Sequence, residues 1–218
     1  MRQDSPHLLS IEVSSSINKT TTQSGIHERG ILCCDCDRKI GVFDDYAYTV
    51  LPAKPDDEKF LVYAPRLRLY ALGDIDVEKF RWFLVSLAWR SAVAKHPLFD
   101  RVELGPYEEQ FRQALLKSDL NAIRSVTAVV SLFQPPKYDR IILQPSRSKY
   151  DGINVLQFYL YPWKLLVKVD KRDFADPFDK LALSSGKPAF AFVHDFLSLG
   201  EIGIINDLKQ RLRTKPET

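Results

Sequence analysis

The chain of 218 residues has few cysteines and no long apolar run. Its three cysteines, Cys33, Cys34 and Cys36, lie so close together that they cannot join distant parts of the chain by disulfides. A secreted, disulfide-stabilised fold is therefore disfavoured, and we expect a reducing, cytoplasmic location. The most apolar stretch, 83–88, is flanked by arginines and is far shorter than the ~18–20 apolar residues of a membrane span.

Several motifs of familiar site types are also missing. The glycines are scattered and form neither G-x-x-x-x-G-K nor G-x-G-x-x-G, the two common phosphate-binding loops. No G-x-S-x-G nucleophile elbow occurs. The first residues lack the positive, apolar and small-residue order of a secretory signal. The sequence therefore gives no sign of these three kinds of site or of export.

The overall composition is that of a globular protein. Hydrophobic residues make up 45% of the chain and charged residues 27%, which is ordinary for a folded domain. The length favours one large domain, or one domain with a small appendage. The formal net charge of +3 is too small to predict a nucleic-acid partner by itself and is compatible with one.

Apolar residues at helical spacing mark the middle of the chain. They predict a helix over 76–95, which Asp74 or Asp76 can cap at its N-terminus. Because apolar side chains occupy nearly every face of this helix, we expect it to be buried in the core. Further helices are predicted over 106–117 and, at the C-terminus, over 201–212.

After residue 125 the pattern changes to short runs of β-branched and aromatic residues separated by turn-forming residues. The runs 155–160 and 164–169, which are separated by turn-forming residues at Tyr161 and Pro162, predict a hairpin. Helices followed by a mostly antiparallel sheet indicate the α+β class. The predicted strands are 126–133, 140–143, 155–160, 164–169 and 189–193.

The cysteine cluster is the one local motif with evident chemistry. Cys33 and Cys36 are separated by two residues, so a tight turn can bring both thiolates to one tetrahedral zinc ion. Structural zinc usually takes four protein ligands, and this pair supplies two. His7, His27 and Cys34 are each able to complete the site, and His27 is the one we carry forward as a metal ligand.

Two alternatives to zinc remain open for these thiols. They can be partly buried side chains with no metal, or they can form a redox pair. Asp35 and Asp37 stand beside the cysteines, and their negative charge opposes a lowered thiol pKa. We therefore favour zinc over redox chemistry.

Other polar residues have simpler structural interpretations. His96 is expected to end the buried helix and to interact with its dipole. His194 and Asp195 follow a predicted strand and are expected to form a turn rather than an acid–base pair. Arg81 and Arg90 lie on the buried helix, where we expect them to pair with carboxylates.

Three segments near the N-terminus resemble a loosely described group of uncharacterised bacterial proteins. That group has a SHIIP-like stretch, an LLC-x-x-CE motif and a following segment that contains tyrosine. The resemblance continues into 80–91 and 102–106 and extends over about half of the chain. The matching segments are Ser5-Pro6-His7-Leu8-Leu9, Gly30-Ile31-Leu32-Cys33-Cys34-Asp35-Cys36-Asp37 and Phe43-Asp44-Asp45-Tyr46-Ala47.

Members of this group are similar, at their N-termini, to the treble-clef zinc domains of HNH-type endonucleases. The resemblance implies a structural zinc on Cys33 and Cys36 and a general-base histidine, His7, with Mg²⁺ or Mn²⁺ at the phosphate. This chain has only one of the two C-x-x-C pairs of that pattern. We therefore expect a degenerate treble-clef or zinc-knuckle-like segment over 1–52 and an α+β globular domain over 53–218.

The leading functional hypothesis is thus a nucleic-acid-binding protein related to HNH-type nucleases. The resemblance implies metal-dependent phosphodiester hydrolysis, in phage or mobile-element conflict. The alternative is a non-catalytic protein-binding or scaffold protein with a structural zinc knuckle, because the sequence contains no complete catalytic set. The expected partner is a nucleic acid or a protein, and not a membrane.

Overall fold

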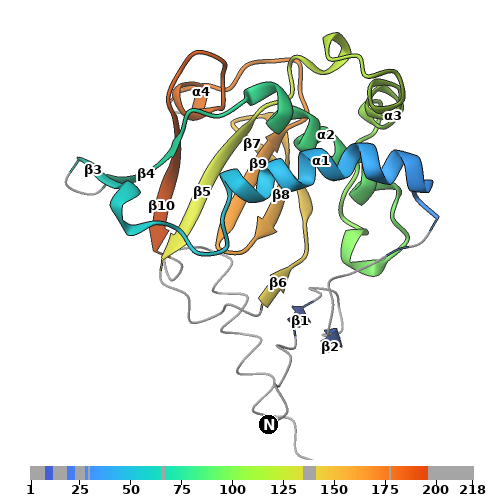
Figure 1. Cartoon of the computed structure of the whole chain (residues 1–218), viewed down its shortest axis with the longest axis horizontal. Helices are drawn as coiled ribbons and strands as arrows, with labels where there is room; N and C mark the ends of the chain where they lie inside the picture. Colours follow the sequence, from blue (N-terminus) through green and yellow to red (C-terminus); the bar gives the residue numbers. More distant parts are fainter. Residues whose placement is uncertain are drawn as a thin grey trace, which may run out of the picture.

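The computed structural model describes residues 8–11, 19–22, 28, 30–64, 67–134, 141–176 and 178–195 (Figure 1). This part of the chain has a mixed α+β fold. No helix in it combines the length and the apolar character needed to cross a membrane. The α-helices are α1 (Cys34–Val50), α2 (Val77–Val93), α3 (Tyr107–Lys117) and α4 (Phe178–Leu181), and the 3-10 helices are η1 (Asp57–Lys59), η2 (Pro97–Phe99) and η3 (Asn121–Ile123).

A seven-stranded sheet forms the centre of the described structure. In spatial order its strands are β3 (Phe60–Ala64), β4 (Leu67–Gly73), β10 (Ala189–Asp195), β5 (Ala128–Gln134), β9 (Trp163–Lys168), β8 (Ile153–Leu160) and β7 (Ser146–Tyr150). Strands β10 and β5 run parallel, and the other neighbouring pairs are antiparallel. A smaller sheet joins β2 (Lys19–Thr22), β1 (Leu8–Ile11) and β6 (Ile141–Leu143).

The two faces of the large sheet pack against different clusters, as β5 shows. Ala128, Val130 and Leu132 belong to the larger core cluster, which includes side chains of α1, α2 and α3. Val129 belongs to a smaller cluster on the other face, where Phe178 of α4 packs. This alternation follows from the two-residue period of a strand. Helices α1 and α2 lie over one face of the sheet in Figure 1.

The predicted buried helix is confirmed as α2. The Asp76 side chain caps it by accepting a hydrogen bond from the Lys79 backbone N–H at 3.0 Å. Most of its apolar side chains are buried. The helix ends at Val93, so His96 lies beyond it, which corrects the prediction that His96 is its last-turn residue. Instead, the His96 Nδ1 atom accepts from the Leu98 N–H at 3.1 Å and begins η2.

The other described predictions are largely confirmed. Helix α3 matches the helix predicted over 106–117, and β8 and β9 form the predicted antiparallel hairpin. The sheet is mostly antiparallel as expected, but the β3–β4 hairpin precedes α2, so the helices do not all come before the strands. The helix predicted over 201–212 lies outside the described residues.

Helix α1, the β3–β4 hairpin and strand β7 are among the elements that the sequence patterns did not predict. Only Ile40, Ala47 and Val50 of α1 are buried, so its apolar stripe is narrow and its helical period weak. Strand β3 lies at the edge of the sheet, and consecutive apolar residues in it, Val62 and Tyr63, are both exposed. Such a strand does not show the in-and-out alternation that identifies one from sequence.

Candidate functional site

The cysteine motif forms the start of α1. Cys33 has an extended backbone and is the N-cap residue, and its Sγ atom accepts a hydrogen bond from the Cys36 backbone N–H at 3.4 Å. The carbonyl of Cys33 accepts from the Asp37 N–H at 2.9 Å, which begins the helical ladder. The sulfur thus takes the place of the side-chain oxygen that caps most helices. Cys33 is exposed, Cys36 is half-buried, and both are free thiols.

The two thiols of this turn are electrostatically unequal. Hydrogen bonds from the backbone N–H and the thiol of Cys36 lower the pKa of Cys33, and the charge of Asp35 opposes them more weakly. The hydrogen bond of Cys36 to Cys33 raises the pKa of the Cys36 thiol, with burial as the second cause. The prediction that neighbouring aspartates oppose a lowered thiol pKa is confirmed for Asp35, whose charge raises the pKa of both thiols. At Cys33 this effect is outweighed by the hydrogen bonds, including the one from the Cys36 backbone N–H at 3.4 Å.

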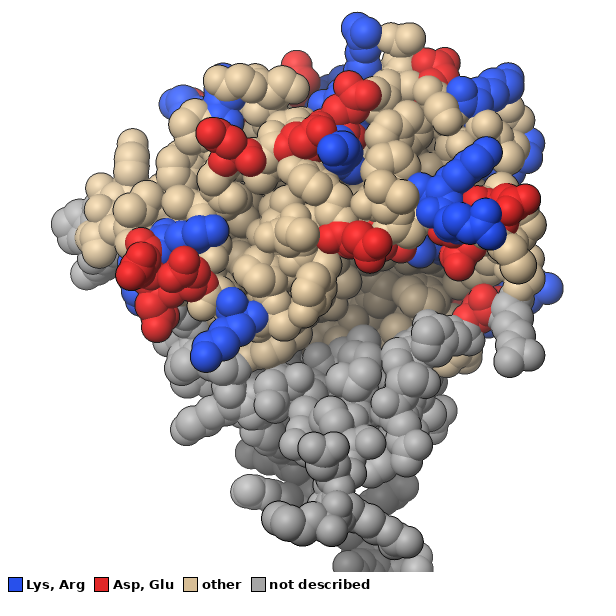
Figure 2. All heavy atoms as spheres, viewed as in Figure 1, with Lys and Arg blue, Asp and Glu red and all other residues tan. Residues whose placement is uncertain are grey.

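Cys34 differs from its neighbours because it lines a cavity of about 900 Å³. Successive side chains of an α-helix point about 100° apart around its axis. Cys34 therefore lies on a different side of the helix from Cys33 and Cys36. Figure 2 shows a recess in the described surface below α1. The walls come from the segment before α1, the end of α2, and the ends of η2 and β8, and they include Ile31, Leu32, Asp37, Leu87, Arg90, Phe99, Phe158 and Leu160.

Two of the predicted zinc ligands, Cys33 and Cys36, are among the described residues. Among them, no group of three or more His, Cys, Asp and Glu side chains is placed to hold a metal ion. His7 and His27 lie outside the described residues, so the catalytic base and the third metal ligand stay predictions. Cys33 and Cys36 fit one half of a tetrahedral site, because they offer two accessible thiols from a single turn.

The remaining residues considered from the sequence have structural contacts. Arg90 donates to the Asp44 carboxylate at 2.7 Å, which confirms the predicted ion pair. Arg81 instead donates to the Val126 carbonyl at 2.8 Å. His194 is part of β10, where its backbone pairs with that of β5, so the predicted turn at this position is wrong.

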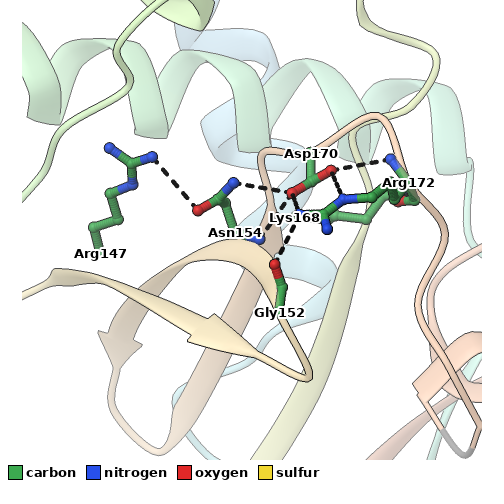
Figure 3. Close-up of polar contacts among 6 residues, drawn as sticks. All are labelled: Arg147, Gly152, Asn154, Lys168, Asp170 and Arg172. Atoms are coloured by element: carbon green, nitrogen blue, oxygen red, sulfur yellow. Dashed lines mark hydrogen bonds and ion pairs between the residues drawn. The ribbon is translucent and has the colours of Figure 1, made fainter.

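A buried polar cluster at the end of β9 was not anticipated from the sequence. Asp170 has a side chain only 8% exposed and accepts hydrogen bonds from two neighbours (Figure 3). Asn154 donates to it from its backbone at 3.0 Å and from its amide at 2.9 Å. Arg172 donates from its backbone, Nε and Nη2 atoms at 3.1, 3.0 and 2.7 Å. Arg172 holds the pKa of the Asp170 carboxyl far below its usual value, although burial acts in the opposite direction.

The same cluster contains a buried lysine. Lys168 is 4% exposed, and its Nζ atom donates to the Arg172 carbonyl at 2.9 Å and to Asp173 at 3.4 Å. It also lies over the ring of Phe174, 5.8 Å from the centroid. Arg172 in turn donates to the carbonyl of Gly152 at 2.7 Å. These contacts fasten the turn after β9 to the turn between β7 and β8, so the cluster is a structural clamp.

A polar cleft of about 560 Å³ adjoins this clamp between β7 and the segment after η2. Arg147 lies in it and faces Glu103 at 3.8 Å and the Asn154 amide oxygen at 3.5 Å. Asn154 therefore contacts both the clamp and the cleft. The cleft carries three cationic and two anionic side chains together with two serines, namely Arg101, Arg147, Lys149, Asp100, Glu103, Ser146 and Ser148.

A sequence signal for the clamp did exist. The run Lys168-Val169-Asp170-Lys171-Arg172-Asp173 places alternating opposite charges directly after an apolar strand. Such a run is usually a solvated turn, and only the fold shows that Lys168 and Asp170 turn inward.

Comparison with known protein families, with curated proteins and with solved structures finds no match to this chain. The cysteine turn and the polar cleft are therefore interpreted from their own chemistry.

Proposed function

We propose that the chain is a nucleic-acid-binding protein related to HNH-type nucleases, with an N-terminal segment organised by a zinc ion. Cys33 and Cys36 are two of the proposed zinc ligands, and His27 is the third. The ion would be structural and would hold the segment before α1 against the body of the protein. His7 is the proposed general base for hydrolysis, with Mg²⁺ or Mn²⁺ as the second metal.

The observation that carries this proposal is the hydrogen-bonded turn at the start of α1. Metal ligation requires thiolates, and the N–H donor at 3.4 Å from the Cys33 sulfur stabilises negative charge there. The helix N-terminus contributes further positive potential. Neither thiol is buried, so both are accessible to an ion. The resemblance to the HNH-type group depends on the same two cysteines.

The polar cleft supports the choice of a nucleic acid as the partner. Lysine and arginine contacts to phosphates supply most of the affinity of non-specific nucleic-acid binding. The exposed Arg101, Arg147 and Lys149 lie along one cleft beside Ser146 and Ser148, whose hydroxyl groups are further donors to phosphate oxygens. We place the nucleic-acid backbone at this cleft.

Binding of labelled duplex DNA, followed by fluorescence anisotropy over a range of salt, tests this function. We expect Lys149→Glu to weaken binding about fivefold to tenfold at low salt and to reduce the salt slope by about one. The matched control is Lys54→Glu, which reverses another exposed charge away from the cleft. Equal losses in the two variants, or no binding by the wild type, would overturn the proposal.

Hydrolysis needs a separate assay. Plasmid nicking with Mg²⁺ or Mn²⁺ compares the wild type with His7→Ala. We expect nicking by the wild type and its loss in the variant. Equal nicking by both proteins would remove His7 from the mechanism, and no nicking by either would reduce the function to binding.

A second candidate function, protein binding, is favoured by the edge strand β3. Leu61, Val62 and Tyr63 are 43%, 78% and 74% exposed in β3, which is an edge strand of the large sheet among the described residues. An exposed apolar edge can accept a strand from another chain. A co-purifying protein that is lost on Val62→Lys, but retained on Lys149→Glu, would favour this function over nucleic-acid binding.

A further inference from the structure

The cavity of about 900 Å³ below α1 has no part in the proposed function, and its size suits a small molecule. Small-molecule sites are concave, enclose about 300–1,000 Å³ and are lined mainly by apolar side chains with a few polar groups. Most residues that line this cavity are apolar, and they come from separate elements, including Leu87 of α2, Phe99 of η2 and Phe158 of β8. The fold therefore assembles an apolar chamber from distant parts of the chain.

A buried hydroxyl group lies on the wall of this cavity. Ser91 of α2 lines the cavity and is only 4% exposed. Its hydroxyl group has no hydrogen-bond partner within the part of the chain that the structure describes. Because a buried hydroxyl group is unfavourable without a partner, a polar atom of a bound molecule would be stabilised there.

The preceding residue, Arg90, brings further donors to the same wall. A guanidinium group has five N–H groups. The Nη2 atom of Arg90 donates to the Asp44 carboxylate at 2.7 Å, and its Nε atom donates to the Ser86 carbonyl at 3.4 Å. The Nη1 atom has no partner among the described residues. Two successive residues of α2 therefore offer hydrogen-bond donors to an acceptor oxygen of a ligand.

The charges around the cavity disfavour an anionic ligand. Glu28 and Asp37 both line it. The Glu28 carboxylate accepts from the Lys95 backbone N–H at 2.9 and 2.8 Å, but such neutral donors leave its negative charge in place. The positive charge of Arg90 is already paired with Asp44 at 2.7 Å. The described lining is thus acidic overall, and it repels a carboxylate or a phosphate.

We propose that this cavity binds an uncharged, mainly apolar molecule that carries a carbonyl group, as ketones, esters and amides do. The carbonyl oxygen accepts hydrogen bonds from Ser91 and Arg90, and the apolar body contacts the remaining walls. An ammonium group does not fit these donors, because it has no acceptor for the N–H groups of Arg90. This inference goes beyond the proposed function, because neither the Cys33–Cys36 pair nor the polar cleft takes part in it.

Two matched probes test the proposal on the purified full chain. The first is prodan, an uncharged naphthalene ketone whose emission moves to shorter wavelength in apolar surroundings. The second has the same ring system with a carboxylate in place of the ketone. Equilibrium dialysis measures the Kd of each probe. We expect saturable binding of prodan with a shift of its emission, and binding of the carboxylate probe that is weaker by at least about fivefold.

Variants of α2 locate the bound probe. Ser91→Ala removes the hydroxyl group, and we expect prodan binding to weaken about threefold to tenfold through loss of one hydrogen bond. Ala94→Phe places a ring in the cavity and should weaken binding by at least about tenfold. The matched control is Ala175→Phe, which adds the same ring at an exposed alanine outside the cavity lining and should bind prodan as the wild type does.

Circular dichroism verifies that each variant is folded, and Ser91→Ala keeps the test decisive if Ala94→Phe does not fold. The inference is overturned if the wild type shows no saturable prodan binding, or if Ser91→Ala binds prodan as tightly as the wild type. It is also overturned if the carboxylate probe binds as tightly as prodan, or if a folded Ala94→Phe variant binds prodan without loss.

Discussion

The clamp around Asp170 and the cysteine turn at Cys33 both gather polar groups at the end of a regular element, yet they differ in one respect. In the clamp, charged groups of Lys168 and Asp170 are buried, and each is satisfied by several protein partners. In the cysteine turn, the thiols are accessible and their bonds inside the described structure are few. Satisfied, buried groups stabilise a fold, whereas accessible nucleophiles remain available to a ligand.

This comparison also shows why a perturbed pKa does not by itself identify a functional site. The carboxyl of Asp170 has the more strongly lowered pKa, mainly through its hydrogen bonds to Arg172, but its side chain is only 8% exposed and both of its carboxylate oxygens already accept hydrogen bonds. The Cys33 pKa is lowered by donors of the Cys36 backbone and thiol, while its sulfur still faces solvent. The site hypothesis therefore follows accessibility and chemistry together.

The largest expected effect is on the clamp. Asp170→Asn removes the charge that Arg172 and Asn154 surround, and we expect it to lower the free energy of unfolding by about 3 kcal/mol. Urea unfolding followed by circular dichroism measures this loss. The matched control is Asp176→Asn, which breaks the exposed pair with Lys180 and should leave stability close to wild type. Similar losses in both variants would contradict the structural role of the clamp.

The clamp should also make stability depend on pH at the acid end. Arg172 holds the folded-state pKa of Asp170 below the unfolded value of about 3.9. Stability from this group is therefore complete above about pH 5 and is lost as the pH falls through the folded pKa. We expect the stability difference between wild type and Asp170→Asn to be constant from about pH 7 to 5 and to shrink below about pH 4. If the stability difference between wild type and Asp170→Asn instead grew as the pH falls, it would contradict a lowered folded-state pKa of Asp170.

A smaller effect is expected for the buried lysine. Lys168→Met removes two hydrogen bonds and one cation–π contact. Methionine has a similar volume and no charge, so the substitution also removes the cost of keeping a charge buried. These terms nearly cancel, so we expect a loss of about 1 kcal/mol or less. Urea unfolding tests this, and a loss as large as that of Asp170→Asn would show that Lys168 is an equal part of the clamp.

The smallest effect on stability is expected at the cysteine turn. In metal-free protein, Cys36→Ser replaces a half-buried free thiol with a side chain of similar size, and it keeps the backbone N–H that donates to the Cys33 sulfur. Its urea midpoint should match that of the wild type within error, while Asp170→Asn shifts the midpoint clearly. A large loss of stability in Cys36→Ser would mean that the thiol is structural and would weaken the comparison.

The sequence predicted those elements whose packing is regular. Helix α2 and the β8–β9 hairpin have apolar patterns that follow from burial on nearly all sides or on alternating sides. Helix α1 and the edge strand β3 were missed because α1 buries only a narrow stripe and β3 exposes consecutive apolar residues.

The candidate cysteine site could be predicted only in part, because its spacing is visible in the sequence and its contacts depend on the fold. The spacing of Cys33 and Cys36 was visible in the sequence, but the hydrogen bonds that make the two thiols unequal depend on where α1 begins. The inward turn of Lys168 and Asp170 could not be predicted, because charged residues after a strand are usually solvated.

Elemental analysis of the purified full chain tests the central claim most directly. We expect one zinc ion per chain in the wild type and in Asp170→Asn, and its loss in Cys36→Ser. A wild type that binds no zinc, or a Cys36→Ser variant that retains the metal, would contradict the claim that this turn is a zinc site.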